Sequence, residues 1–170
     1  MIDSSTIITL SELNALDLLE NLRGEANVIV PRSVQEELKE GQHGIEIKNV
    51  ICPPDIYSIK EEGEEEVKGL LEGLGRGEKE VIEIVYGIAR KMNRVQAIAI
   101  TDDLVARKRC KRIGIPVMGI LGLIEFAKRR KVITKNQALK IIDSIPSTSL
   151  YITQELLVQV RERMEKQKVE

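Results

Sequence analysis

The sequence predicts an α/β domain built on a parallel sheet, and two observations support this fold class. Short apolar segments alternate with longer stretches in which apolar residues recur at helical spacing. The segment 97–100, Ala-Ile-Ala-Ile, has no polar face, as is typical of a strand that is covered on both sides of a parallel sheet. Buried strands that alternate with helices indicate βαβ units, in which successive strands run parallel.

Strands are expected at short apolar runs that are bounded by residues which interrupt regular structure. The run before Pro31 is an example, because proline cannot donate to a hydrogen-bonded ladder. The first strand is short, with only Met1 and Ile2 before Asp3. We assign the other strands to residues 27–30, 49–52, 97–100 and 116–118.

Helices are expected where apolar residues recur every three or four positions. Pro31 suits the start of the helix over residues 32–40, and Gly41 ends this helix. A longer helix that opens at Gly77 has one continuous apolar stripe. We assign helices to residues 6–22 in two pieces, 32–40, 61–74, 77–92, 104–113, 119–131, 135–144 and 153–166.

Length and composition fit one domain with a substantial core. The chain has 170 residues, of which 42 % are hydrophobic, and single domains usually contain roughly 100–200 residues. We expect a main domain over residues 1–145 and a C-terminal helical extension over residues 146–170 that packs on the same domain. The Pro-Ser-Thr-Ser break at residues 146–149 marks the boundary.

Cysteine content and hydropathy favour a soluble, cytoplasmic protein. Cys52 and Cys110 do not form a CxxC pair, and we expect both to be reduced, packed thiols. No signal peptide is expected, because acidic residues appear by Asp3 and Glu12 and no basic segment precedes an apolar run. No apolar stretch approaches the roughly 20 residues that a membrane span requires.

Charge is unevenly distributed along the chain, although the net charge is only −1. Residues 60–83 contain nine acids and four bases, whereas residues 107–131 contain nine bases and one acid. The basic segment suits a partner that carries phosphates. Two solvated helix faces of opposite sign explain the same pattern equally well.

The residues present exclude several common catalytic devices. His43 is the only histidine and is better explained as a residue of a glycine-flanked loop: a zinc site would need more ligands, and a Ser-His-Asp or Cys-His device would depend wholly on His43 without an elbow motif beside a Ser or Cys. The glycines at residues 73–77 indicate a hinge between helices, and no GxxxxGK[ST] motif is present. Aromatic residues make up 2 % of the chain, which argues against base stacking on exposed rings. Chemistry based on oxygen ligands remains.

Acidic residues directly follow two of the expected strands. Asp3 follows the first strand, and Asp102 and Asp103 follow the strand at 97–100 after Thr101. Ligands of open parallel sheets bind beyond the carboxyl ends of the strands, so neighbouring strands would bring Asp3 close to Asp102 or Asp103. An Asp at a strand-to-helix junction is also a favoured helix N-cap, and this alternative has about equal weight for either residue alone.

Two glutamates face inward on their expected helices. Glu78 lies on the apolar stripe of its helix, and Glu37 lies at the edge of an inward face. An inward carboxylate costs several kcal/mol unless it is paired or bound to a metal. Taken alone, each glutamate is better explained by a position near the start of its helix, where the helix dipole stabilises a negative charge. Four acids from four segments that all point toward one crevice nevertheless favour a functional site. The other glutamates of these helices are expected to face outward or to flank the stripe: Glu36, Glu40, Glu80 and Glu83.

Ordered motifs in the chain resemble the PIN-domain family, and more narrowly a prokaryotic branch related to the toxins of toxin–antitoxin pairs (VapC-like). Each motif is weak alone, whereas their order and spacing over about residues 1–131 are fairly specific. The motifs are Asp3-Ser4-Ser5 and the segments 30–38 (VPRSVQEEL), 74–82 (LGRGEKEVI), 100–107 (ITDDLVAR) and 114–119 (GIPVMG).

The resemblance implies a three-layer α/β/α sandwich around a parallel sheet, and cleavage of RNA that depends on Mg²⁺ or Mn²⁺. It also suggests RNA as the substrate and an antitoxin protein as a partner. The third acid of the family is commonly Asp, whereas in this chain it would be Glu78. Glu80 is an alternative, because the motif also fits when it is shifted by two residues. Carried onto this chain, the catalytic acids are Asp3, Glu37, Glu78, Asp102 and Asp103, of which Asp3, Glu37, Glu78 and Asp103 would hold the metal.

Basic residues follow the last acidic pair on one expected helix. Arg107 and Lys108 are candidates for contacts to the RNA backbone. Thr101 is a candidate for a hydrogen bond to a metal-bound water, although an ordinary strand threonine is the slightly better explanation. A homodimer would join two such basic surfaces into one longer cleft.

Two other functions remain open. A non-catalytic PIN-like module would use the same fold to bind RNA or a protein. A receiver-like signalling domain also has acids at strand ends, but it needs a lysine after a late strand, where this chain has Gly119. The terminal helix at residues 153–166 is expected to pack on its own domain, with a second copy or an inhibitor as alternative partners.

Overall fold

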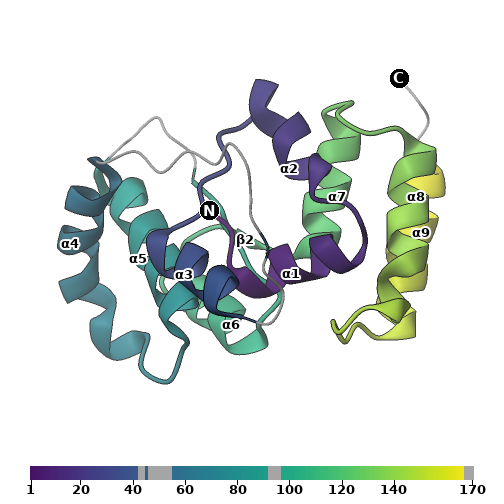
Figure 1. Cartoon of the computed structure of the whole chain (residues 1–170). Coiled ribbons are helices and arrows are strands. Elements are labelled where there is room, and N and C mark those ends of the chain that lie inside the picture. The colour runs from purple at the N-terminus through teal and green to yellow at the C-terminus, as the bar shows by residue number, and fades with distance from the viewer. Residues whose placement is uncertain (42–44, 46–54, 92–96, 167–170) are drawn as a thin grey trace.

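The computed structural model describes residues 1–41, 45, 55–91 and 97–166 (Figure 1). Within these residues the chain is mostly helical and contains a small parallel sheet. Short 3-10 turns occupy Leu22–Gly24, Lys68–Leu70 and Ile145–Ser147. The α-helices are α1 (Ser4–Glu12), α2 (Asp17–Asn21), α3 (Arg32–Glu40), α4 (Asp55–Val67), α5 (Arg76–Lys91), α6 (Leu104–Arg112), α7 (Ile120–Arg129), α8 (Lys135–Ser144) and α9 (Gln154–Lys166).

Two short strands form the regular part of the sheet. β1 (Ala99–Ile100) pairs in parallel with β2 (Val117–Met118), and Ala99 lies opposite Val117. The helix α6 connects them, so these elements form one βαβ unit. Both residues of β1 are buried, as the absence of a polar face in its sequence predicts.

Backbone hydrogen bonds extend the sheet to the N-terminus of the chain. An isolated parallel bridge joins Ile2 to Ile100 on the edge of β1 that faces away from β2. The amide of Ile2 in turn donates to the carbonyl of Ile29 at 3.2 Å. Four segments therefore lie side by side in the order Ile29, Ile2, β1 and β2, which places the residue after Ile2 beside the residue after Ile100.

The parallel sheet is present in a smaller form than the sequence predicts. The strands expected at 97–100 and 116–118 shorten to β1 and β2. The strand expected at 27–30 is reduced to the bridging residue Ile29. The strand expected at 49–52 and the loop residue His43 lie outside the described residues. In the part of the chain that the structure describes, helices dominate, and a full three-layer sandwich is not evident.

The expected helices are present: the two pieces expected over residues 6–22 are α1 and α2, and one other helix has clearly different bounds. The helical pattern over residues 6–22 is divided into α1 and α2 by Asn14, whose φ of 51° is incompatible with a continuous right-handed helix. The charged helix expected at 61–74 begins earlier and ends earlier, as α4. Its first turn contains apolar Ile56, which is 5 % exposed and belongs to the core.

The shift of α4 changes the environment of α5. The two helices approach closely at Gly87, where an added Cβ would collide with the backbone oxygen of Ile59. The cation Lys60 of α4 reaches two glutamates of α5, Glu80 and Glu83, which are each 7 % exposed. The prediction that Glu80 and Glu83 flank the buried stripe was therefore wrong, because α4 covers that side of α5.

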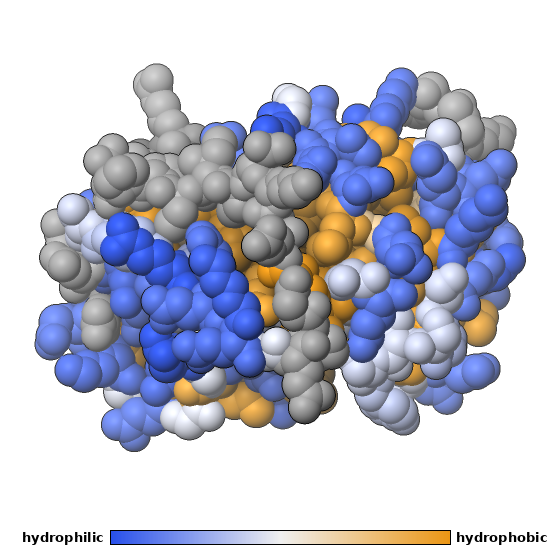
Figure 2. Space-filling view, viewed as in Figure 1, coloured by the Kyte–Doolittle hydropathy of each residue, from blue (hydrophilic) through white to orange (hydrophobic). Residues whose placement is uncertain are grey.

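The C-terminal helix α9 packs against α8 at one end of the molecule. Val160 and Met164 are its buried residues, and Arg161 pairs with Asp143 of α8. Hydrophilic side chains cover this pair of helices in the space-filling view (Figure 2). These contacts fit a helix that packs on its own chain, and the division of the chain before residue 146 stays a prediction.

Candidate functional site

Asp3 lies where the sheet meets the first helix. Its amide donates to the carbonyl of Ile100 at 3.1 Å, which fixes Asp3 beside the end of β1. Its carboxylate is the N-cap of α1, because Oδ1 accepts from the amide of Thr6 at 2.9 Å. Oδ2 accepts from the hydroxyl of Ser5 at 3.0 Å. Asp3 is only 1 % exposed, and each carboxylate oxygen retains a free lone pair beyond these bonds.

Glu37 joins the start of α1 to the start of α5. Its Oε2 accepts from the hydroxyl of Ser4 at 2.7 Å, and its Oε1 accepts from the amide of Gly77 at 2.8 Å. Ser4 follows Asp3 in the chain, and Gly77 precedes Glu78. A Cβ at Gly77 would lie 2.6 Å from Oε2 of Glu37, so this position is occupied by glycine because the carboxylate fills the space.

Glu78 shares an electrostatic environment with the other three candidate acids. Its carboxylate accepts from the amide of Gly75 at 2.6 Å. Burial is the largest cause that raises the pKa of Glu78, and the Gly75 amide opposes it. The negative charges of Asp103, Asp3 and Glu37 raise this pKa further. Acids from four separate segments therefore lie close enough to repel one another.

Asp102 and Asp103 are adjacent but have different partners. Asp103 is the N-cap of α6, and its Oδ1 accepts from the amide of Ala106 at 2.6 Å. Oδ2 of Asp102 accepts from the amide of Ile120 at 2.8 Å, at the start of α7. Burial raises the pKa of Asp102 most strongly, the Ile120 amide lowers it, and the charge of Asp3 raises it again.

The other predicted site residues lie close to this pair in the chain. Thr101 is buried, and its hydroxyl accepts from the amide of Asp103 at 3.2 Å, which orders the turn into α6. Nη1 of Arg107 lies 4.0 Å from Oδ1 of Asp102. Lys108 is exposed on α6, and among the described residues it makes no ion pair. The contacts of Thr101 are those of a structural residue, and the substrate roles of Arg107 and Lys108 stay predictions.

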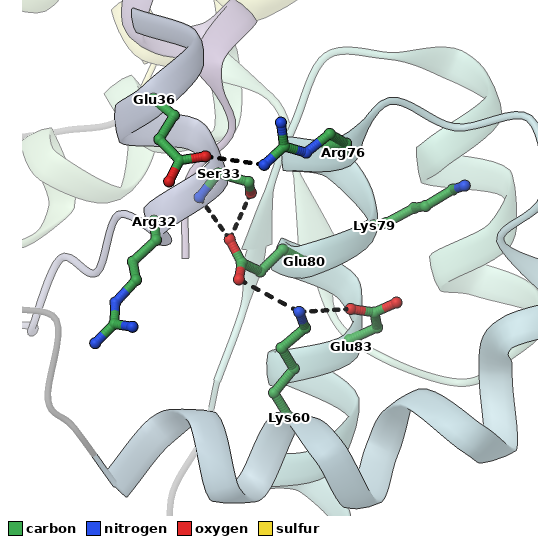
Figure 3. A pocket seen from close by; sticks show the side chains of 8 residues that line it. All are labelled: Arg32, Ser33, Glu36, Lys60, Arg76, Lys79, Glu80 and Glu83. Atoms are coloured by element: carbon green, nitrogen blue, oxygen red, sulfur yellow. Dashed lines mark hydrogen bonds and ion pairs between the residues drawn. The ribbon is translucent and has the colours of Figure 1, made fainter. Parts of the chain in front are cut away.

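Glu80, the alternative to Glu78, points into a different cleft. This cleft has a volume of about 310 Å³ and lies between α3, α4 and α5 (Figure 3). Oε2 of Glu80 accepts from the amide and the hydroxyl of Ser33 at 2.8 and 2.5 Å. Nζ of Lys60 lies 3.4 Å from Glu80 and 3.7 Å from Glu83. Glu80 therefore has its own cation, which favours Glu78 as the third acid of the site.

The four acids fit a hard divalent cation by their donor atoms. Carboxylate oxygens are the ligands that Mg²⁺ and Mn²⁺ prefer. Among the described residues, none of the four forms an ion pair, so no side-chain cation neutralises them. Within the same residues, no three acidic, histidine or cysteine side chains form a ready metal-ligand group. Each of the four carboxylates accepts hydrogen bonds from backbone amides or serine hydroxyls.

A buried hydroxyl near the acids also lacks a normal partner. Oγ1 of Thr6, in the first turn of α1, makes no hydrogen bond of normal geometry within the described part of the chain. It nevertheless lies close enough to Asp102 to lower the pKa of that carboxyl. A buried polar group of this kind is usually satisfied by water or by a ligand.

Sequence reasoning did not single out Ser4, Gly77 and Gly119, although each shapes the site. Ser4 could have been recognised as a hydroxyl residue that directly follows Asp3. Gly77 could have been recognised from its place at the start of a helix beside Glu78. Gly119 has no signal in a single sequence, because its role depends on a side chain that is remote in the chain.

A family model described as PIN domain matches residues 1–166, and the chain belongs to the PIN-domain family. The resemblance inferred from the ordered motifs is thereby confirmed, and the matched region extends beyond these motifs into α9. No curated protein and no solved structure matches the chain. Among the described helices, none is both long and apolar enough to cross a membrane.

Proposed function

We propose that the chain is a PIN-type endoribonuclease that hydrolyses RNA phosphodiester bonds with Mg²⁺ or Mn²⁺. The observation that carries this proposal is the bridge made by Glu37, whose two oxygens bind beside Asp3 and beside Glu78. Membership of the PIN-domain family supports the proposal, because many PIN domains are nucleases. The parallel βαβ unit beside the site supports the α/β character that we expect for such an enzyme.

The residues that would hold the cation follow from their positions. Asp3 and Asp103 lie at the ends of adjacent parallel segments and would bind it directly, with Glu37 and Glu78 completing the shell or orienting water. When bound, the cation supplies a more acidic water and neutralises charge on the phosphate. Carboxylates that repel one another gain stability from such a cation, and after burial the charges of Asp103, Asp3 and Glu37 are the further causes that raise the pKa of Glu78.

The proposed contact to the RNA backbone is a basic face near the start of α6, formed by Arg107 and Lys108. The other cations of this helix, Arg109, Lys111 and Arg112, lie further from its N-cap, Asp103, and are not part of the proposed contact. Arg107 and Lys108 lie nearest to the start of the helix, and they are proposed to bind phosphates beside the acids. Thr101 keeps the turn before α6 in place and with it the carboxylate of Asp103.

Further partners and the location of the protein belong to the same proposal. An antitoxin protein would keep such a ribonuclease inactive, and a homodimer would join two copies of the basic face. Both suggestions derive from the likeness to toxin ribonucleases and from the charge of α6. A cytoplasmic location is proposed because the cysteines are expected to be reduced, packed thiols, and Cys110 is a buried free thiol.

Cleavage of a fluorescent single-stranded RNA in Mn²⁺ tests the proposal. We expect Asp3→Asn and Asp103→Asn each to lower the rate by at least about a thousandfold, because each removes a carboxylate ligand. Glu37→Gln should also be strongly impaired, whereas its neighbour Glu36→Gln, on the outer face of the same helix, should retain activity. Unchanged cleavage by both aspartate variants would exclude this mechanism. RNA binding without turnover by the wild-type protein would favour a non-catalytic module.

A further inference from the structure

Asp102 is held between the start of α7 and a cation of α6. One carboxylate oxygen, Oδ2, accepts from the amide of Ile120 at 2.8 Å. The other, Oδ1, faces Nη1 of Arg107 at 4.0 Å. The side chain of Asp102 is 10 % exposed and that of Arg107 is 34 % exposed, so the pair lies at the edge of the interior. The positive end of the α7 dipole further stabilises a negative charge at this place.

Gly119 provides the space in which this pair lies. A Cβ at Gly119 would overlap with Oδ1 of Asp102 and would lie 2.8 Å from Nη1 of Arg107. Both ends of the ion pair therefore pack directly on the backbone of the residue before α7. Any larger side chain at Gly119 would separate Asp102 from Arg107 or displace them together.

The position of Arg107 on α6 directs its side chain toward the candidate acids. Side chains on an α-helix tilt toward the helix N-terminus, and α6 begins at Asp103. Asp102 holds the guanidinium at this end of the helix, and the charge of Asp3 acts on Asp102 there. Arg107 is thus the one cation of α6 that forms an ion pair within the described residues, and it does so beside the site.

We propose that Asp102 is a positioning residue, and not a metal ligand, that holds Arg107 so that its guanidinium binds the phosphate cleaved beside Asp3 and Asp103. This inference rests on the proposed ribonuclease function. A guanidinium presents paired N–H donors that match two oxygens of a phosphate, but only when its orientation is fixed. Asp103 differs from Asp102 because, among the described residues, it has no cationic partner.

Measurements of metal binding distinguish the roles of the adjacent residues Asp102 and Asp103. In calorimetric titration with Mn²⁺ alone, Asp103→Asn should weaken binding by at least about tenfold, whereas Asp102→Asn should bind within about twofold of wild type. Asparagine at 102 can still accept from the amide of Ile120, so the fold should be retained, which circular dichroism would check. Equal loss of Mn²⁺ binding in both variants would overturn the positioning role and make Asp102 a ligand.

Cleavage rates test whether Asp102 acts through Arg107. We expect Asp102→Asn and Arg107→Ala each to slow single-turnover cleavage by about 10- to 100-fold, with no further loss in the double variant. Arg107→Lys should recover little, because lysine cannot make the paired contact. Arg112→Ala, in the last turn of α6, is the control and should change the rate less than about threefold. Effects of Asp102→Asn and Arg107→Ala that multiply in the double variant would overturn the coupling.

A third readout does not depend on RNA cleavage. In the wild-type protein, the Nε–H of Arg107 should give a separate NMR signal that exchanges slowly with water, and this signal should broaden in Asp102→Asn but not in Arg112→Ala. An unchanged signal in an active Asp102→Asn enzyme would overturn the positioning role alone. A wild-type protein that binds Mn²⁺ and orders Arg107 but cleaves no RNA would instead overturn the ribonuclease proposal and the proposed role of Arg107 with it.

Discussion

Carboxylates gather in two regions of the protein, and the two regions provide them with different partners. Between α3, α4 and α5, Glu80 and Glu83 share the cation of Lys60, and Glu80 also accepts two hydrogen bonds from Ser33 (Figure 3). In the candidate site, and within the part of the chain that the structure describes, the acids accept hydrogen bonds only from neutral amides and hydroxyls. That second set is Asp3, Glu37, Glu78 and Asp103.

This difference distinguishes a structural cluster from a site. A buried carboxylate beside a fixed cation is stabilised by that cation, so Glu80 has less need of a bound metal. Carboxylates that have only neutral donors retain their mutual repulsion, and at Glu78 the charges of Asp103, Asp3 and Glu37 add to burial, the largest cause, in raising the pKa. Residue type alone does not separate the two regions, because Glu78 and Glu80 lie two positions apart on one helix. The presence or absence of a partner cation does.

The largest expected effect on stability concerns the paired region. We expect Glu80→Ala to lower the free energy of unfolding by about 2–3 kcal/mol, because it leaves Lys60 with one distant partner and Ser33 without its acceptor. The matched control is Glu36→Ala in the lining of the same cleft. Glu36 pairs with Arg76 at the surface, where both side chains are more than half exposed, so its loss should cost less than about 0.5 kcal/mol. Urea denaturation measures both values.

If Glu80→Ala and Glu36→Ala lower the free energy of unfolding by the same amount, Glu80 does not form a buried ion pair in solution. A second check uses the variant Glu80→Ala combined with Lys60→Met. Each single variant already breaks the Lys60–Glu80 pair, so the double variant should lose less stability than the sum of the two single losses, although Glu83 then also loses its contact with Lys60. A double variant that is less stable by the full sum of the single effects would contradict this explanation.

The acids at the strand ends were predictable from the sequence because their positions depend on local pattern. Asp3 and Asp103 directly follow apolar runs, and parallel strands bring such positions to one edge. The inward face of Glu37 follows from the periodicity of its own helix, and the exposure of Glu36 and Glu40 was correctly predicted in the same way. The sequence pattern did not predict how the side chains bind each other, which depends on Ser4 and on the backbone of Gly77 and Gly75.

The paired region could not be predicted, because it depends on the packing of two helices. The charged segment around residues 61–66 suggests a solvated helix, and its acids obscure the apolar start of α4 at Ile56 and Ile59. Only contact between α4 and α5 at Gly87 places Lys60 beside Glu80. Glycine within the apolar stripe of a long helix was the one available signal of that close approach.

A smaller effect is expected where the two regions meet, at Gly77. In Gly77→Ala the new methyl group would collide with Oε2 of Glu37 and with a methyl group of Val34. We expect a loss of about 1–2 kcal/mol of stability and at least about a tenfold loss of cleavage, because Glu37 is displaced from its bridging position. Gly69→Ala is the control, since an added Cβ meets nothing within 4 Å there. Full activity of Gly77→Ala would argue that the Glu37 bridge is dispensable.

The smallest effect tests the repulsion itself, through Glu78→Gln. The pKa of Glu78 is higher in the folded state than its ordinary value. The native protein therefore binds a proton at Glu78 more tightly than the unfolded chain does, and the stability that this proton contributes is lost as the pH rises through the folded pKa. At pH 8 in EDTA, Glu78→Gln should therefore be a few tenths of a kcal/mol more stable than wild type, a small value because Glu78 is only partly buried. Below the ordinary pKa of a glutamate the difference should vanish, and saturating Mn²⁺ at pH 8 should reverse it by stabilising the wild type alone. If Glu78→Gln is less stable than wild type in EDTA, the hydrogen bond from the Gly75 amide stabilises Glu78 by more than the neighbouring negative charges destabilise it. The two regions would then not differ in whether their charges are neutralised.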